Sequence, residues 1–260
     1  MLTVKFMTLG GNMKILVTND DGIHSEGLRL LALELQKNHD VYVVAPDRER
    51  SATSHGITLR NPMDLKKVRL EGIINDAYTL SGTPADCVRV GLELLYKDID
   101  IVFSGINRGY NAGADVQYSG TVGACAEANI YKPPGVAIST EFADGNSQFE
   151  LPSKFAPILF ERYKSLLLNN IIVLNINVPK LDETDIKGVA VCELGDIIYD
   201  SFKLEEISED HHVIHLKERF AKYIKPDSDQ EYLSNGYITI TPMEYGFGDS
   251  ELLEKFKKVK

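Results

Sequence analysis

The segment KILVTNDDG, residues 14–22, decides the fold class of this chain. Its first five residues form a short apolar run typical of a buried strand, and residues 19–22 have the composition of a turn. Leucines at helical spacing follow, and a second apolar run, VYVVA at 41–45, comes after them. Residues 14–45 therefore predict a strand, a helix and a second strand parallel to the first.

The same alternation continues through the middle of the chain. Thr83 and Pro84 are typical of the cap and the first residue of a helix, and a buried strand is expected at 99–103. The further expected elements are a helix at 119–131, a strand at 135–140, a helix at 153–169 and a strand at 171–178. This pattern predicts an α/β fold with a doubly wound, mostly parallel, Rossmann-like sheet.

The pattern changes near Lys187, where short alternating runs typical of a β-ribbon begin, namely VAVCEL, HHVIHL and GYITITP. We therefore expect an α/β domain at 13–185 and a β-rich arm with the C-terminal segment at 186–260. Residues 1–12 are expected to be a disordered N-terminal extension. An isolated ribbon is marginal and must cover its apolar side chains, so the arm is expected to mediate self-association to a dimer or tetramer.

The composition excludes several classes of protein. The chain has 38 acidic and 28 basic residues and a formal charge of -10, which argues against binding of polymeric nucleic acid. It has no apolar run of about 18 residues to span a membrane, and Met1–Asn12 does not resemble a secretory signal. The three cysteines, Cys87, Cys125 and Cys192, lack metal-ligand spacing. A cytoplasmic protein with reduced cysteines is expected.

Polar residues follow three of the expected strands. Asp20 and Asp21 follow the first, residues 47–51 follow the second, and residues 104–107 follow the strand that ends at Phe103. Ligands of open α/β sheets bind at the carboxyl ends of the strands, and adjacent carboxylates suit a hard cation such as Mg²⁺ or Mn²⁺. The simpler interpretation is that Asp21 caps the following helix. Because oxygen donors recur at the other two strand ends, we favour the metal site.

A glycine-rich stretch, NRGYNAGADVQYSGTVGACAE at 107–127, runs directly into a helix. Exposed backbone N–H groups and a helix N-terminus form a cradle for phosphate, although glycines also serve tight packing alone. The stretch is neither a Walker A loop nor a dinucleotide fingerprint. Asp20-Asp21 also lacks the DxD spacing of aspartyl-phosphate enzymes, so a metal-activated water is the more natural nucleophile.

Basic side chains near the same edge have two interpretations. His24 and His55 are either polar loop residues or proton donors and acceptors. Arg48, Arg50 and Arg108 are either solvated surface residues or clamps for a phosphate group.

Taken together, these motifs resemble the SurE family, the stationary-phase survival nucleotidases. The resemblance rests on KILVTNDDG at 14–22, VAPDRERSATSHGIT at 44–58, SGTPADCV at 81–88, SGINRGYNAGADVQYSGTVGACAE at 104–127 and NINVP at 175–179. It implies a SurE-like fold in which 13–185 is the catalytic domain and the arm is exchanged between subunits. It also implies a metal-dependent phosphatase that hydrolyses nucleoside 5′- and 3′-monophosphates, with some members also trimming short polyphosphate.

The resemblance also implies roles for individual residues. The family's metal, one divalent ion per subunit, is held by two adjacent Asp, a Ser and an Asn, which match Asp20, Asp21, Ser51 and Asn107. Asp20 or Asp21 is then also the catalytic group that accepts a proton from the water. The residues that match the family's phosphate-contacting loop are Asn111, Ser119, Gly120 and Thr121.

Two other functions use the same features. A nucleotide or phosphate sensor without turnover would need the same cradle and metal. A metal-dependent glycosyltransferase would bind a sugar nucleotide through carboxylates and Mg²⁺ or Mn²⁺. Release of inorganic phosphate separates the phosphatase from both.

Overall fold

The computed structural model describes residues 12–246, 256 and 257. The expected N-terminal extension therefore lies outside the described residues, apart from Asn12. Among the described residues, no helix is long and apolar enough to cross a membrane.

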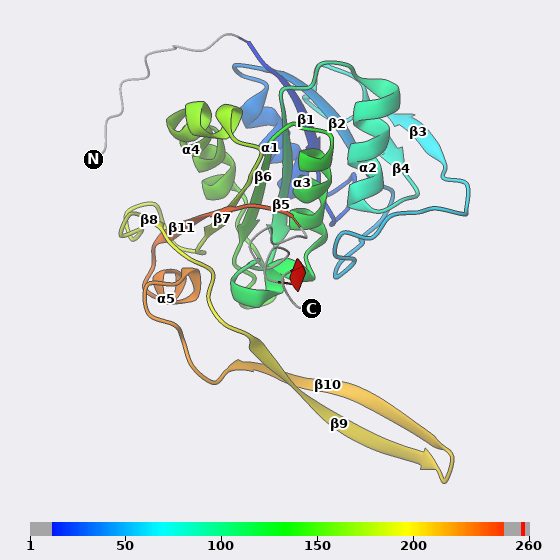
Figure 1. The fold of residues 1–260 in the computed structure, drawn as a ribbon, viewed down its shortest axis with the longest axis vertical. Coiled ribbons are helices and arrows are strands. Elements are labelled where there is room, and N and C mark those ends of the chain that lie inside the picture. The colour runs from blue at the N-terminus through cyan, green and yellow to red at the C-terminus, as the bar shows by residue number, and fades with distance from the viewer. Residues whose placement is uncertain (1–11, 247–255, 258–260) are drawn as a thin grey trace.

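A nine-stranded, mostly parallel sheet forms the centre of the fold, with strand order β3-β4-β2-β1-β5-β6-β7-β11-β8 (Figure 1). Its strands are β1 (Lys14–Thr18), β2 (Asp40–Pro46), β3 (Leu65–Val68), β4 (Ala77–Leu80), β5 (Ile101–Arg108), β6 (Gly135–Thr140), β7 (Val173–Val178), β8 (Val189–Val191) and β11 (Ile238–Met243). Two pairings in this sheet, β3 with β4 and β11 with β7, are antiparallel, and its other six are parallel. The predicted α/β class and mostly parallel sheet are confirmed.

Helices cover both faces of the sheet (Figure 1). They are α1 (Glu26–Leu35), α2 (Pro84–Val90) with its π-helical extension η1 (Gly91–Leu95), the 3-10 helix η2 (Gly113–Gln117), α3 (Gly120–Ile130), α4 (Glu150–Asn169) and α5 (Asp229–Ser234). Successive side chains of β1 point to opposite faces. Ile15 and Val17 accordingly pack in one apolar cluster with α1 and α4, and Leu16 packs in another with α2 and α3.

Local sequence explains where the helices of the site begin. Thr83 caps α2: its hydroxyl accepts a hydrogen bond from the N–H of Asp86, whose carboxylate accepts one from the N–H of Thr83. Ser119 caps α3 by accepting a hydrogen bond from the N–H of Val122 at 3.1 Å. The predicted helix starts at Pro84 and after Ser119 are confirmed.

The region after residue 185 does not form one continuous arm, because part of it joins the main sheet and part of it projects. Strands β8 and β11 complete the main sheet, whereas β9 (Ile198–Ser208) and β10 (His211–Ala221) pair only with each other in the described part. This hairpin projects away from the sheet (Figure 1). The projecting element is thus shorter than 186–260, because the alternating runs at 189–191 and 238–243 find partners in the sheet itself.

The close approach of α1 to β5 requires glycine at position 27. A Cβ on Gly27 would lie 2.4 Å from the carbonyl oxygen of Ile106. In an exposed helix, replacement of Gly by Ala stabilises by up to roughly 1 kcal/mol. Here the backbone oxygen cannot move aside without shifting β5.

We therefore predict that Gly27→Ala lowers the free energy of unfolding, by about 1–3 kcal/mol, as expected for overpacking. Urea denaturation measures the change. Arg29→Ala, two residues later on the same helix, is the control and should change stability little. A Gly27→Ala protein more stable than the wild type would contradict the close contact.

Candidate active site

Asp20 and Asp21 lie in the turn that connects β1 to α1. Asn19 closes this turn, because its Oδ1 accepts a hydrogen bond from the N–H of Gly22 at 3.2 Å and its Nδ2 donates one to the Gly22 carbonyl at 3.0 Å. Gly22 has a φ of +98°, and a Cβ there would lie 3.1 Å from the carbonyl carbon of Arg48. Glycine at 22 therefore permits both the turn and the close passage of the loop after β2.

The Asp20 side chain is buried against the start of α3. Asp20 is 4% exposed, and its Oδ1 accepts a hydrogen bond from the Thr121 hydroxyl at 2.7 Å. A Cβ on Gly120 would lie only 3.0 Å from the Cβ of Asp20. Burial raises the pKa of Asp20 to about 6; the hydrogen bond from Thr121 lowers it and the charge of Asp21 raises it. The site thus holds a carboxyl group whose charge is poorly solvated.

Asp21 links the end of β1 to the end of β5. One of its carboxylate oxygens accepts a hydrogen bond from the backbone N–H of Arg108 at 3.2 Å. Burial raises the pKa of Asp21, and the Arg108 amide and guanidinium oppose this shift. Helix α1 begins at Glu26 with Ser25 in the cap position. The simpler interpretation of Asp21 as a helix cap is therefore wrong.

The other two predicted metal ligands lie on neighbouring segments. Ser51 is exposed, and its hydroxyl donates a hydrogen bond to Glu49 at 2.7 Å. The preceding residue contacts the Asp pair, Asp20 and Asp21, because the N–H of Arg50 donates a hydrogen bond to the carbonyl of Asp20 at 2.7 Å. Asn107, near the end of β5, donates from Nδ2 to the Gly109 carbonyl at 2.8 Å. The fold thus places the carboxyl ends of the parallel strands β1, β2 and β5 side by side.

The predicted phosphate loop is held from two sides. Ser119 and Gly120 form the start of α3, where backbone N–H groups and the helix dipole favour an anion. The hydroxyl of Thr121 donates to Asp20, and the backbone N–H of Thr121 also forms a hydrogen bond to this carboxyl that lowers its pKa. Asn111 is buried, and its Nδ2 donates a hydrogen bond to the Ser139 hydroxyl at 2.8 Å.

Two buried asparagines of β7, both within the NINVP motif at 175–179, support this loop, although neither was among the predicted site residues. The N–H of Asn111 donates to Oδ1 of Asn177 at 2.9 Å, and Nδ2 of Asn175 donates to the carbonyl of Asn111 at 2.7 Å. The signal was present, because polar amides at alternate positions of an otherwise apolar strand must find buried partners. These amides fix the backbone of the glycine-rich loop.

The two candidate histidines differ in their surroundings. His24 is exposed. His55 forms a short hydrogen bond from Nε2 to the Glu127 carboxylate, and its Nδ1 lies 3.2 Å from the Tyr245 hydroxyl. Both ring nitrogens of His55 are thus occupied by protein groups.

Two of the three candidate arginine clamps, Arg50 and Arg108, contact other protein groups. The guanidinium of Arg50 donates to the carbonyl of Ser81 at 2.8 Å. That of Arg108 lies 3.8 Å from Glu49 and 5.6 Å from the centre of the Phe142 ring. Arg48 is exposed.

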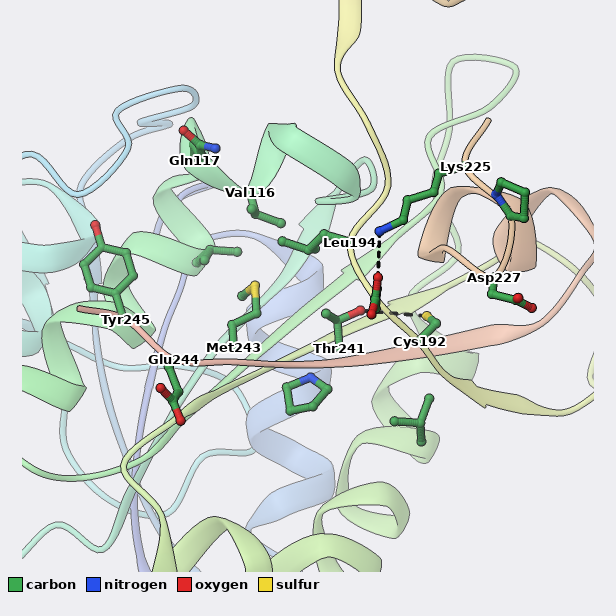
Figure 2. A pocket seen from close by; sticks show the side chains of 15 residues that line it. Val116, Gln117, Cys192, Leu194, Lys225, Asp227, Thr241, Met243, Glu244 and Tyr245 are labelled. Atoms are coloured by element: carbon green, nitrogen blue, oxygen red, sulfur yellow. Dashed lines mark hydrogen bonds and ion pairs between the residues drawn. The ribbon is translucent and has the colours of Figure 1, made fainter. Parts of the chain in front are cut away.

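Cavities occur beside the Asp pair and farther from it. A cleft of about 260 Å³ borders Asp21, Arg108 and Phe149. A larger hollow of about 1070 Å³ lies between η2 and the end of β11, lined by Val116, Leu194, Met243 and Tyr245 among others (Figure 2). The Asp pair does not line the larger hollow, so volume alone does not locate the site.

The kind of ligand atom limits which metal the site can hold. Within the described part of the chain, no group of three or more His, Cys, Asp or Glu side chains is placed to bind a metal ion. A site built on Asp20 and Asp21 must therefore be completed by hydroxyl, amide or water oxygens, which suit Mg²⁺ or Mn²⁺ better than softer ions.

Comparison with known proteins gives a consistent result. Residues 15–201 match the family model described as survival protein SurE. The 5'-nucleotidase SurE of Clostridium botulinum (strain ATCC 19397 / Type A) is 43% identical over 250 residues, which is 95% of this chain and 99% of the relative. That of strain Alaska E43 / Type E3 is 38% identical over the same shares of both chains. The crystal structure of SurE protein from Aquifex aeolicus superposes with a TM-score of 0.79 at 31% identity, covering 94% of this chain and 98% of that one. On the fold, the motifs and these relatives, the chain belongs to the SurE family.

Proposed function

We propose that the chain is a metal-dependent phosphatase that hydrolyses nucleoside monophosphates to nucleoside and phosphate. The observation that carries this proposal is the buried carboxyl of Asp20, which lies beside Asp21 and directly against the N-terminus of α3. In this proposal a cation site and an anion site adjoin, as metal-assisted phosphoryl transfer requires. The curated relatives named 5'-nucleotidase SurE support the substrate class.

The residues present fit a hard divalent ion. Asp20 is nearly inaccessible, and its carboxyl accepts hydrogen bonds from neutral groups, the Thr121 hydroxyl and the backbone N–H groups of Asp20 and Thr121. A bound cation would offset both the lost hydration of Asp20 and the repulsion from Asp21. In our proposal one Mg²⁺ or Mn²⁺ per subunit is held by Asp20, Asp21, Ser51 and Asn107. When bound, such an ion adds positive charge at the phosphoryl group and lowers the pKa of a water molecule.

The chain's own groups then perform two tasks. The start of α3, at Ser119, Gly120 and Thr121, binds the phosphoryl oxygens, and Asn111 fixes the preceding loop. In this proposal Asp20 or Asp21 also accepts the proton of the attacking water. Whether the ester is 5′ or 3′, and whether short polyphosphate is also cleaved, depends on contacts outside this set.

The rival functions lack such support. The two Clostridium botulinum relatives, which match nearly the whole chain, are named as 5'-nucleotidases and not as sensors or glycosyltransferases. A cytoplasmic location belongs to the proposal too. It is supported by the three cysteines, all free in the described structure, of which Cys87 and Cys125 are buried.

Phosphate release tests the function directly. We predict turnover of nucleoside monophosphates with added Mg²⁺ or Mn²⁺, weaker turnover of ATP, and none after exhaustive chelation. Asp20→Asn and Asp21→Asn should each lower the rate at least about a hundredfold, since each removes charge from the site. Near-normal turnover in Asp20→Asn, or consumption of a sugar nucleotide without phosphate release, would reject the proposal.

The raised pKa of Asp20 predicts how the metal-free protein responds to pH. The folded-state pKa of about 6 exceeds the ordinary aspartate pKa of 3.8, so folding favours the protonated form. The cost of ionising Asp20 is absent below about pH 4, grows as the pH rises to about 6, and is then constant at about 3 kcal/mol.

Asp20→Asn keeps the acceptor for Thr121 and removes this cost. Without metal, the variant should therefore unfold at higher urea than the wild type at pH 8 and at nearly the same urea at pH 4. Added Mg²⁺ should stabilise the wild type more than the variant. A variant less stable than the metal-free wild type at pH 8 would contradict the burial cost.

The hairpin β9–β10 is proposed to mediate self-association to a dimer or tetramer. Side chains such as Phe202, Leu204, Ile214 and Leu216 are more than half exposed along it. A two-stranded ribbon that covers none of these side chains gains little from folding alone. Contact with a second copy of the chain would remove them from water.

We predict that deleting the hairpin lowers the mass of the particle in solution. Ile198 and Ala221 are paired across its base, so a short Gly-Ser turn can replace residues 199–220. Light scattering should then show a folded monomer where the full chain shows an oligomer. Equal masses for the two chains would contradict the role of the hairpin.

A further inference from the structure

The segment that carries Ser51 lies directly on α3. We define the Ser51 loop as residues 47–58. The N–H of Ser54 donates to the carbonyl of Tyr118 at 3.0 Å, and its hydroxyl donates to the carbonyl of Gln117 at 2.6 Å. A Cβ on Gly123 would lie 2.4 Å from the Ser54 carbonyl oxygen. The loop thus reaches α3 only because that face of the helix carries glycine.

The backbone of the Ser51 loop is strained at two positions. Ala52 has a φ of +56° and Ser54 a φ of +51°, and neither residue is glycine. Non-glycine residues occupy this left-handed region only when surrounding contacts compensate for its cost. The conformation of the loop therefore depends on contacts that hold it to the rest of the protein.

One of these contacts is buried and charged. Glu127 lies seven residues after Gly120 on α3, and its side chain is 6% exposed. One carboxylate oxygen bonds to Nε2 of His55, whose side chain is 16% exposed, and the other lies 3.4 Å from Nε of Arg89. Removing either nitrogen partner would leave the buried carboxylate of Glu127 partly uncompensated, which costs much stability. Glu127 therefore holds His55 and Arg89 in place.

Arg89, the second partner of Glu127, also lies 3.9 Å from Asp86, which holds the far end of the loop. Asp86 is fully buried, and both of its carboxylate oxygens accept a hydrogen bond from the N–H of Thr58, at 3.0 and 3.1 Å. The near end is held by the bond from Arg50 to the Asp20 carbonyl. His55 lies between these two anchors, four residues after Ser51.

We propose that His55 is a positioning residue, which pins the Ser51 loop to α3 through Glu127 and thereby sets the affinity of the site for its divalent ion. This proposal rests on the proposed function, in which Ser51 is a ligand of that ion. With both ring nitrogens bonded to protein groups, His55 acts through the position of the loop and not as a proton donor to the substrate.

Direct binding of Mn²⁺ without substrate tests the proposal. Titration calorimetry on the full-length protein should give a Kd for Mn²⁺ about tenfold or more higher in His55→Ala, the scale found for groups that orient metal ligands. The value of kcat at saturating Mn²⁺ should remain within about threefold of the wild type. His55→Gln can still donate to Glu127 and should recover part of the affinity, and it replaces His55→Ala if that variant does not fold.

A second readout reports on the loop itself. Trypsin should cut the metal-free His55→Ala protein faster than the wild type after Arg48 or Arg50, and saturating Mn²⁺ should slow the cut. The matched control is His39→Ala, which removes a buried histidine that lies 3.4 Å from Glu161 and whose ring packs against Phe160 of α4. It should lower the melting temperature without changing the Kd for Mn²⁺ or the cleavage rate.

Three results would overturn the proposal. An unchanged Kd in His55→Ala, with only a lower melting temperature, would reduce His55 to a structural residue. A large loss of kcat at saturating Mn²⁺ with an unchanged Kd would assign it to proton transfer instead. A wild type that releases phosphate without any divalent ion would reject the proposed metal site first, and this proposal with it.

Discussion

The site depends on one constraint, namely that the carboxyl of Asp20 is excluded from water beside a second carboxyl. A buried carboxylate without a cation is costly, and here the protein supplies only partial compensation through the Thr121 hydroxyl and the start of α3. The fold provides this arrangement because β1 is central, with β2 and β5 on either side of it. The loops after all three strands meet at the same edge, where helices on opposite faces leave room for a ligand.

The small residues of α3 follow from the same constraint. Gly120 lies against Asp20, and Gly123 lies against the Ser51 loop, so a side chain at either position would push a site segment away from the helix. The glycine-rich sequence therefore does two things at once. It exposes backbone donors, and it sets the distance between the helix, the Asp pair and the loop that carries Ser51.

Several features of the fold and the site could be predicted from the sequence because each depends on residues that are close together in the chain. The Ser119 cap, the Pro84 helix start and the polar turn at Asp20 are each determined by a few consecutive residues. The site's long-range partners could not be predicted in that way. Thr121 meets Asp20 across 101 positions and His55 meets Glu127 across 72, and such pairs depend on how the helices pack on the sheet. The sequence also did not show that the strands at 189–191 and 238–243 join the main sheet, because a strand's pattern does not identify its neighbour.

The hairpin β9–β10 has a consequence for how the protein must be handled. In the described structure each of its strands pairs only with the other, so both outer edges present unpaired N–H and C=O groups beside exposed apolar side chains. Such edges are templates for adding further strands. Correct assembly then competes with irregular edge-to-edge association, and the balance depends on how long a newly made chain remains unpaired. Slow refolding at high concentration is the condition that most favours the irregular product.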